Sequence, residues 1–177
     1  MSKSVGLPRR VVMRRIKVGA LVTLDGVRAD PQSWALEYFD EAMVERSLAG
    51  LERTDAMLLG RGAYEYFQPT WPQAEGPYMD RINAMRKLVF SDSLEAVDWC
   101  NAELVRGDAV DAVRGMEGRF VVYGYTRLAQ SLLAAGLVDE LDFAVHPLVL
   151  TPKRALTLVA AEAQASGVVS IKVDAHA

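Results

Sequence analysis

RIKVGALVTLDG, residues 15–26, begins as an alternation of basic and apolar residues and then becomes continuously apolar. A short run of this kind that ends at turn residues is typical of a buried strand. Asp25-Gly26 supplies the turn, and a loop is expected to follow it through Asp30-Pro31 to Trp34. The stretch therefore predicts a central strand of a sheet with a long loop at its carboxyl end.

Strand patterns and helix patterns alternate along the rest of the chain. Strands are expected at residues 55–59, 87–90, 102–105, 119–123 and 141–145, and helices at residues 37–51, 62–67, 78–85 and 108–114 and between Thr126 and Gly136. The last two strands, residues 156–159 and 168–173, are expected to form an antiparallel hairpin. This alternation predicts a three-layer α/β/α domain with a mostly parallel central sheet and an antiparallel C-terminal edge. We expect one domain over residues 15–177, preceded by a flexible extension at residues 1–14.

Composition excludes several classes of function. The chain has 177 residues, a formal net charge of −3, one cysteine and two histidines. This length suits one domain with its own core, and the charge does not indicate nucleic acid or a membrane as a partner. The lone Cys100 excludes an intramolecular disulfide, and with so few histidines no metal centre is expected. No apolar run reaches the roughly 20 residues needed to cross a bilayer, and no export signal is recognised, so we expect a cytoplasmic protein.

Three residues stand where strands end, which is where parallel sheets bind ligands. They are Asp25, Gly60 and Gly124. A glycine between a strand and a helix lets a phosphate reach the free backbone N–H groups at the helix start. Glycines at such positions also serve simply as turns, and Asp25-Gly26 has the same alternative reading.

Five short motifs occur together in an order that resembles one enzyme family. They are VTLDG at 22–26, LLGR at 58–61, YG at 123–124, GLVDE at 136–140 and HP at 146–147. In combination they resemble the dihydrofolate-reductase-like family that includes the reductase domain of riboflavin biosynthesis. The resemblance extends from residue 15 to residue 173 and implies a dihydrofolate-reductase-like fold. It also implies an NAD(P)H-dependent reductase that transfers hydride to a small heterocyclic or ribosyl substrate. The His-x-Glu and Cys-x-x-Cys signature of a zinc deaminase is absent, which indicates a free-standing reductase.

The resemblance also implies which residues bind the cofactor. Gly60 would approach the pyrophosphate, Arg61 would face the adenosine phosphate or ring, and the remaining positions are Ala63, Ser91, Gly124, Tyr125 and Thr126. NADPH is the expected cofactor, with NADH possible. Four departures fall on this side: Ala63 replaces a threonine, Asp92 an arginine and Tyr125 a small residue, and residues 150–153 replace a glycine-containing turn. A carboxylate at position 92 would repel a 2′-phosphate.

On the substrate side, Asp25 is the expected catalytic carboxylate, because in similar enzymes this residue lies near the nicotinamide. Asp40 is a second candidate, although acidic residues in a first helical turn also favour the helix dipole. The rings of Trp34, Tyr64 and Trp71 could wall a flat substrate, or else fill the edge of the core. His146 is read as a buried structural residue rather than an acid or base.

Two functions remain open from the sequence. The first is the reductase. The alternative is a catalytically impaired small-molecule-binding or dimerisation module of the same fold, which the altered cofactor positions favour. Similar proteins often form homodimers through their late strands, and the apolar residues 141–145 and 168–173 would permit this.

Overall fold

The computed structural model describes residues 13–175. The expected extension at residues 1–14 therefore lies almost wholly outside the described residues, as does His176. Ten strands are described: β1 (Arg15–Thr23), β2 (Ala56–Gly60), β3 (Arg86–Phe90), β4 (Ala102–Val105), β5 (Arg119–Tyr123), β6 (Glu140–His146), β7 (Leu148–Leu150), β8 (Lys153–Ala155), β9 (Thr157–Ala163) and β10 (Val169–Asp174). The α-helices are α1 (Glu41–Glu52), α2 (Arg61–Phe67), α3 (Pro77–Ala84), α4 (Ala109–Arg114) and α5 (Arg127–Ala134), and three short 3-10 helices are η1 (Pro31–Ser33), η2 (Leu36–Tyr38) and η3 (Trp71–Gln73).

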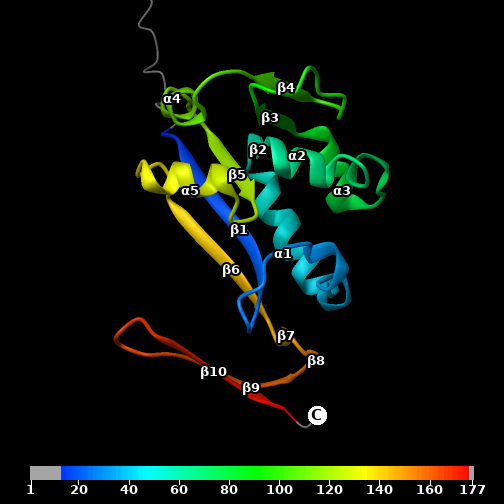
Figure 1. Ribbon diagram of the computed structural model, residues 1–177, viewed down its shortest axis with the longest axis vertical. Helices are drawn as coiled ribbons and strands as arrows, with labels where there is room; N and C mark the ends of the chain where they lie inside the picture. Colours follow the sequence, from blue (N-terminus) through cyan, green and yellow to red (C-terminus); the bar gives the residue numbers. More distant parts are fainter. Residues whose placement is uncertain (1–12, 176–177) are drawn as a thin grey trace, which may run out of the picture.

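Six parallel strands form the central sheet, in the order β4-β3-β2-β5-β1-β6. Successive side chains of a strand point to opposite faces, and the core divides accordingly. Leu58 of β2 packs with residues of α4 and α5 in one cluster, whereas Met57 and Leu59 pack with residues of α1, α2 and α3 in another. Helices therefore cover both faces of the sheet (Figure 1), which confirms the predicted three-layer α/β/α architecture.

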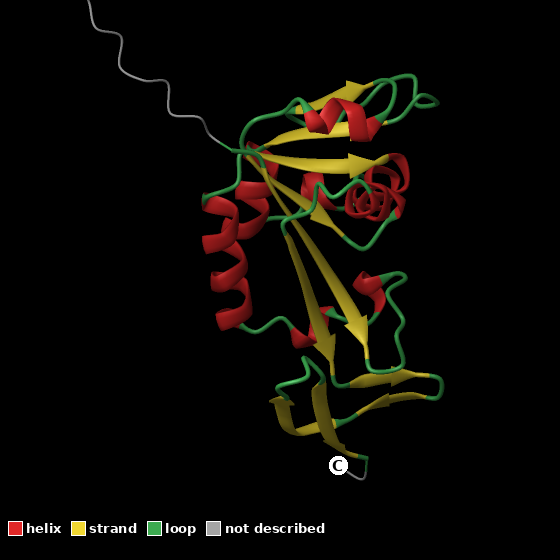
Figure 2. Ribbon diagram, turned by 90° about the vertical axis from the view of Figure 1, so that its left-hand side faces the viewer, coloured by secondary structure: helices red, strands yellow, loops and turns green. Residues whose placement is uncertain are grey.

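The strands diverge toward their carboxyl ends (Figure 2). β2 pairs with β5 only at Ala56 and Met57, so the ends of these two strands are not held together by backbone hydrogen bonds. β1 pairs with β5 as far as Gly19 but continues along β6 to Thr23. Four further residues carry the end of β1 roughly 13 Å beyond its last pairing with β5. The carboxyl edge is thus stepped, with the end of β1 lying beyond the end of β5.

Local capping explains where two helices begin and end. The expected helix from residue 37 was wrong at its start: α1 begins at Glu41 because the Asp40 side chain accepts a hydrogen bond from the Met43 amide at 2.7 Å, and η2 occupies the preceding residues. α5 agrees with the prediction. Thr126 caps its start, and Gly136, with a φ of 67°, follows its end. A left-handed backbone at that point favours glycine.

The C-terminal strands form two small antiparallel sheets of their own. β9 and β10 make the predicted hairpin, and the short pair β7 and β8 was not foreseen. Neither pair joins the six-stranded sheet. The hairpin instead lies beyond the carboxyl end of β6 (Figure 1).

A buried lysine ties the end of α3 to the turn before β4. The Lys87 side chain is fully buried, and its ammonium donates hydrogen bonds to the carbonyl oxygens of Asn83, Met85 and Cys100 at 2.9–3.1 Å. It also lies over the Trp99 ring, 4.8 Å from the ring centre. Burial lowers the pKa of Lys87 to about 8. All three N–H donors of the ammonium are thereby satisfied, which makes this lysine a structural cross-link.

Candidate functional site at the carboxyl ends of the strands

The structure places one candidate phosphate-binding glycine against the helix that follows the other. Gly60 ends β2 and directly precedes α2, and Gly124 follows β5 just before α5. A methyl group on Gly60 would lie 3.5 Å from the Cβ of Leu128 in the first turn of α5. The segment after β2 therefore lies against the start of the helix after β5. This is the part of a parallel sheet where ligands bind.

Gly124 is required by the backbone itself. Its φ is 81°, a conformation that side chains disfavour, and an added Cβ would lie 3.3 Å from the Cγ2 of Thr126. Its amide donates to the carbonyl of Gly19 at 2.7 Å, which fixes the turn to β1. Thr126 caps α5 with a long hydrogen bond of 3.5 Å from the Ala129 amide. The turn is thus held in place while the hydroxyl of Thr126 is only weakly engaged.

Gly60 differs from Gly124 in that nothing within the chain requires a glycine there. Its φ and ψ are −80° and 164°, an extended conformation that any residue adopts, and the 3.5 Å contact is an ordinary van der Waals distance. Gly60 occupies the cap position of α2, and no side chain caps that helix start. The first N–H groups of α2 are therefore available to an external acceptor.

Arg61 opens α2 and is held in a fixed position by two neighbours. Its Nε donates to Glu65 at 2.7 Å, and its Nη1 donates to the Ser93 hydroxyl at 2.8 Å. A guanidinium has five N–H donors, so three of them have no partner among the described residues. The side chain is about half exposed. Arg61 can consequently receive an anion without losing the contacts that orient it.

The loop after β3 lies beside Arg61 and has its own internal order. The Ser91 hydroxyl accepts hydrogen bonds from the amides of Ser93 and Leu94 at 3.2 and 3.1 Å. The carboxylate of Asp92 accepts one from the Gly107 amide at 2.8 Å, and Arg106 donates to the Ser91 carbonyl at 2.8 Å. Asp92 therefore stabilises the adjoining loop after β4, a role that the sequence did not reveal. Arg106 of that loop donates in return to the Ser91 carbonyl, so hydrogen bonds in both directions join the two loops.

Ala63 and Tyr64 lie on the side of α2 that packs against the core, not on its exposed side. Ala63 packs against the cluster beneath α2, and Tyr64 is only 6% exposed. The Tyr64 hydroxyl donates to the Asp98 carboxylate at 2.7 Å and accepts from the Asp98 amide at 3.0 Å. Burial raises the pKa of this phenol. The expectation that Tyr64 lines a substrate site is therefore not supported.

Trp71 belongs to an aromatic cluster that reaches the end of β5. Its ring lies 4.1 Å from that of Phe67, 6.2 Å from that of Trp99 and 5.9 Å from that of Tyr123. The Tyr78 hydroxyl donates to the Tyr123 hydroxyl at 2.7 Å, and burial raises the pKa of both phenols. Trp71 is half-buried. Of the three rings expected to wall a substrate, it alone retains substantial exposure near the carboxyl edge.

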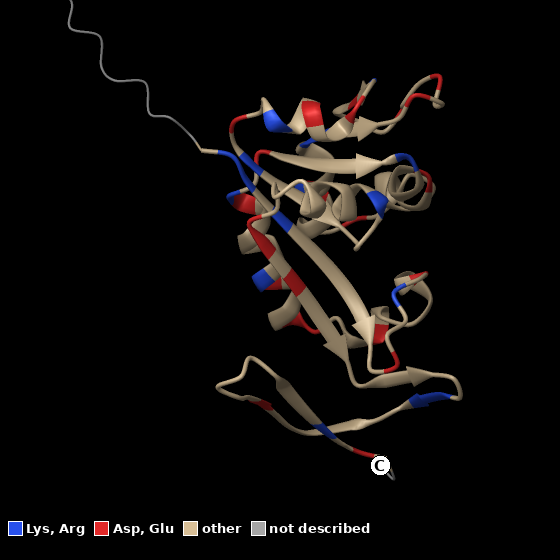
Figure 3. Ribbon diagram, turned by 60° about the vertical axis from the view of Figure 1, so that its left-hand side comes forward, with Lys and Arg blue, Asp and Glu red and all other residues tan. Residues whose placement is uncertain are grey.

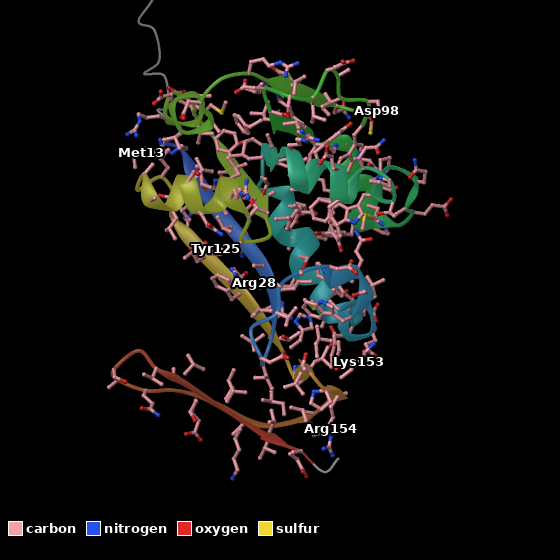
Figure 4. The ribbon with its side chains drawn as sticks, viewed as in Figure 1. Met13, Arg28, Asp98, Tyr125, Lys153 and Arg154 are labelled. Atoms are coloured by element: carbon pink, nitrogen blue, oxygen red, sulfur yellow. The ribbon has the colours of Figure 1, made fainter. Side chains whose placement is uncertain are left out.

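Tyr125 is turned away from the glycine turn. Its ring lies 5.7 Å from that of Phe143 on β6, and the Arg28 guanidinium lies 5.2 Å from its ring centre. Figure 4 shows Tyr125 and Arg28 on the side of β6 and α5. The conformation shown therefore leaves the space before Gly124 clear of the Tyr125 ring. A tyrosine at this position need not obstruct a pyrophosphate.

Asp25 follows the end of β1 and anchors a loop. One carboxylate oxygen accepts from the Thr23 hydroxyl at 2.5 Å, and the other accepts from the amides of Leu150 and Thr151 at 2.9 and 3.3 Å. The Thr23 hydroxyl, followed by the Leu150 amide, lowers the pKa of Asp25. A carboxylate has about four acceptor positions, and three are in use. Asp25 is exposed, so it can accept one more hydrogen bond while remaining ionised.

Two other expected site residues have structural positions. Trp34 is 3% exposed, its Nε1 donates to the Ala29 carbonyl at 2.9 Å, and its ring packs against His146. Asp40 is the cap of α1 rather than a member of that helix. These placements do not support a substrate-binding role for Trp34 or Asp40. His146 is buried between Trp34 and Tyr38, in agreement with its structural reading.

Four polar contributors were missed from the sequence: Arg28, Ser93, Arg106 and Tyr123. Each stands within a few residues of a strand end that the sequence did identify. That proximity was the available signal, but the partner of each lies far away in the chain. Ser93 is 32 residues from Arg61, and Tyr123 is 45 residues from Tyr78.

A hollow of about 450 Å³ at the opposite edge of the sheet is lined by residues that include Asp55, Arg86 and Phe120. It lies at the amino ends of the strands, where parallel sheets do not usually bind ligands. Within residues 13–175, no cluster of side chains could ligate a metal, and no helix has the length and hydropathy to cross a membrane.

Comparison with known proteins gives one family. The sequence profile of the RibD C-terminal domain matches residues 14–173. A curated relative, the uncharacterized protein YyaP of Bacillus subtilis, is 25% identical over 150 residues, which is 77% of each chain. This relative supports the family without giving a reaction.

Solved structures give the fold. A protein from Shewanella sp. PV-4 that is named as a riboflavin biosynthesis protein superposes with a TM-score of 0.60 at 18% sequence identity. The match covers 90% of this chain and 98% of the Shewanella chain. A deaminase/5-amino-6-(5-phosphoribosylamino)uracil reductase from Thermotoga maritima superposes with a TM-score of 0.53 at 13% sequence identity. That match covers 92% of this chain and 57% of the Thermotoga chain. Dihydrofolate reductase from Enterococcus faecalis, solved with NADP(H), gives 0.52 at 13% identity and covers 84% of each chain. The fold is therefore dihydrofolate-reductase-like.

Proposed function

The chain belongs to the RibD C-terminal domain family, and from this premise we propose that it is an NAD(P)H-dependent reductase acting on a small heterocyclic or ribosyl substrate. The observation that carries the proposal is the meeting of two helix starts at the carboxyl edge, with Gly60 against the first turn of α5. Backbone N–H groups at a helix start favour a phosphate group. Two such starts side by side suit a pyrophosphate.

The residues present fit the phosphate groups of a dinucleotide. Gly60 has no side chain that would exclude an anion from the start of α2. Nothing within the chain requires a glycine at this position, so a glycine here is explained if an external group occupies the space that a side chain would take. Gly124 and Thr126 offer a fixed turn with a weakly engaged hydroxyl. Arg61 supplies N–H donors beside them. These four residues would hold the phosphate-bearing part of the cofactor, with Ser91 ordering the adjacent loop.

When bound, a nicotinamide cofactor supplies a hydride, and the protein must position the acceptor and limit access of water. Asp25 can orient an amino or hydroxyl group through its remaining acceptor position. Because the lowered pKa keeps it ionised at neutral pH, it acts as an acceptor rather than as a proton donor. Trp71, half-exposed on the other side of the edge, offers a flat apolar surface.

The substrate class rests on the relatives. The Thermotoga neighbour names a phosphoribosylamino-uracil and the Enterococcus neighbour a folate reductase. Amino-pyrimidine ribosyl phosphates and dihydropteridines are therefore the two classes to test. NADPH is the preferred candidate reductant, because Arg61 can meet an additional phosphate on the adenosine.

A second function is favoured by the contacts that two candidate site residues already make within the protein. Both oxygens of Asp25 already bind groups of the protein, and Tyr64 is held by Asp98. A module that binds a nucleotide without catalysing its oxidation does not need these side chains for a substrate, so their hydrogen bonds within the protein would not impair it. Binding and turnover must therefore be measured separately.

The test is a titration of the protein with NADPH and with NADH, followed by tryptophan fluorescence and by calorimetry. Trp71 is the expected reporter because Trp34 and Trp99 are buried, so Trp71→Phe should remove the fluorescence change but leave the calorimetric signal. Saturable binding followed by cofactor oxidation with an amino-pyrimidine ribosyl phosphate or dihydrofolate supports the reductase. Binding without oxidation supports the module, and no binding of either cofactor refutes both.

A further inference from the structure

One face of β1 is open, although β1 lies inside the sheet between β5 and β6. Three residues on the face toward α5 are at most 6% exposed: Ile16, Val18 and Ala20. The alternate residues Lys17, Gly19 and Leu21 point to the other face, and they are only half-buried. The helix on that side does not seal the face, because α1 packs against α3 and buries only Leu51 fully. The face of β1 around Gly19 is therefore accessible.

Gly19 leaves additional room on this face. Its backbone is part of a regular strand that pairs with both neighbours, so the conformation does not require a glycine. An added Cβ would meet only the ring of Tyr123, at an ordinary distance of 3.9 Å. A glycine inside a strand often marks a place where a ligand approaches the backbone closely. The space beside the Tyr123 ring is therefore available to a ligand.

The Tyr123 hydroxyl borders this space and has a proton to donate. Tyr123 is the register partner of Gly19, ends β5 and directly precedes Gly124 of the proposed phosphate site. Its oxygen accepts a hydrogen bond from the Tyr78 hydroxyl at 2.7 Å, and it makes no other hydrogen bond within residues 13–175. A phenol both accepts and donates, so the O–H of Tyr123 is left for a ligand. Burial raises the pKa of both phenols, which keeps them protonated at neutral pH.

The other ionisable groups near this face are engaged or distant. The Lys17 ammonium forms ion pairs with two carboxylates of β6, at 3.1 and 2.6 Å. Figure 3 shows charged residues in the first half of β1 and of β6 and none in the second half of either strand. Asp25 is ionised, and it follows the end of β1, roughly 13 Å or more along the strand from Gly19. Asp25 and Tyr123 therefore face different parts of an extended substrate, and Tyr123 is the one that carries a proton.

We propose that Tyr123 is the proton donor of the reduction, that Tyr78 restores its proton, and that the bond reduced is a C=N bond. This inference rests on the proposed reductase function. The substrate carbon gains the hydride, the π electrons of the C=N bond move to the nitrogen, and the nitrogen forms an N–H bond with the Tyr123 proton. The Tyr123 phenolate then takes the proton of Tyr78, which water replaces. Because the nitrogen becomes far more basic than a phenolate as it gains the electron pair, a phenol with a raised pKa can protonate it. A dihydropteridine contains such a bond, and a ribosylamino group forms one when its sugar ring opens.

The test measures kcat and KM with NADPH and either dihydrofolate or the phosphoribosylamino-uracil for which the Thermotoga neighbour is named, and NADPH affinity by calorimetry. Tyr123→Phe should lower kcat about 100-fold or more, which is the usual contribution of a general acid, with KM and NADPH affinity unchanged. Tyr78→Phe should cause a smaller loss of kcat, because Tyr123 keeps its own proton. Tyr38→Phe is the matched control: it removes a phenol hydroxyl from η2, where the ring packs on His146, and should keep the parental kcat. Circular dichroism establishes that each variant is folded, and Tyr123→Met, which also lacks a donor, replaces Tyr123→Phe if that variant is not.

The outcomes separate the proton donor from the reductase function. A parental kcat in Tyr123→Phe overturns the donor and leaves the reductase intact. A loss of NADPH affinity in that variant would show that Tyr123 contacts the cofactor instead, and a larger loss of kcat in Tyr78→Phe would show that Tyr78 is the donor; either result makes the proposal wrong. An equal loss of kcat in Tyr38→Phe also overturns it. A parent that binds NADPH but reduces neither substrate fails as a reductase, and the donor fails with it.

Discussion

Replacing Gly60 with alanine should abolish most cofactor binding while leaving the fold unchanged. The backbone at Gly60 is extended, and an added methyl group would make only an ordinary contact with Leu128 at 3.5 Å. The same methyl group would stand between the start of α2 and the start of α5, where the pyrophosphate is proposed to bind. Stability and binding should therefore respond in different ways.

The expected magnitudes follow from this geometry. Losing the flexibility of glycine in the unfolded chain stabilises the protein by about 0.4–1 kcal/mol, and alanine is a poorer helix cap than glycine by a similar amount. The net change is close to zero, so Tm should move by no more than about 2 °C. Excluding the phosphate from one backbone donor removes a hydrogen bond to a charged group, worth about 1.5–3 kcal/mol, and should weaken binding roughly 10- to 100-fold.

Calorimetric titration with NADPH and a thermal melt measure both quantities on one sample. Gly124→Ala is the matched control: its φ of 81° makes alanine unfavourable by about 1–2 kcal/mol, so this variant should lose stability as well as binding. Parental NADPH affinity in Gly60→Ala would refute the proposed approach of phosphate at Gly60. A large loss of stability in Gly60→Ala would contradict the unconstrained backbone at Gly60.

Three further substitutions test separate parts of the structure. Arg61→Ala removes a charged partner of the adenosine phosphate and should weaken NADPH binding about 10-fold, with a smaller effect on NADH binding. Equal losses of affinity for the two cofactors in calorimetry would exclude a contact between Arg61 and the extra phosphate. Lys87→Met removes the three hydrogen bonds from the buried ammonium to backbone carbonyl oxygens and should cost about 3 kcal/mol, seen as a Tm lower by roughly 6–12 °C. Asp25→Asn tests linkage: because the folded pKa is lowered, the stabilisation is present above the ordinary carboxyl pKa and is lost as pH falls through the folded value. Melts at decreasing pH should therefore show a steeper acid loss in the parent than in Asp25→Asn, and parallel curves would contradict the contact with Leu150.

The sequence predicted the architecture well where apolar pattern and capping agree. β4 and β5 have the expected bounds, and Thr126 and Gly136 enclose α5 as expected. The start of α1 was wrong because the apolar spacing continues through residues that form a 3-10 turn. There, the competition between two helix types is settled by the capping hydrogen bond of Asp40, which apolar spacing does not encode.

The site was harder to predict, because the same type of residue can serve either to bind a ligand or to stabilise the fold. An aromatic side chain that stacks on a ligand and one that fills the core have the same identity in sequence, and only the partners distinguish Trp34 and Tyr64 from Trp71. Asp92 raises the same difficulty: its carboxylate suggested repulsion of a phosphate, whereas its hydrogen bond to Gly107 stabilises a loop. Glycine was more informative, since its position after a strand limits what it can do.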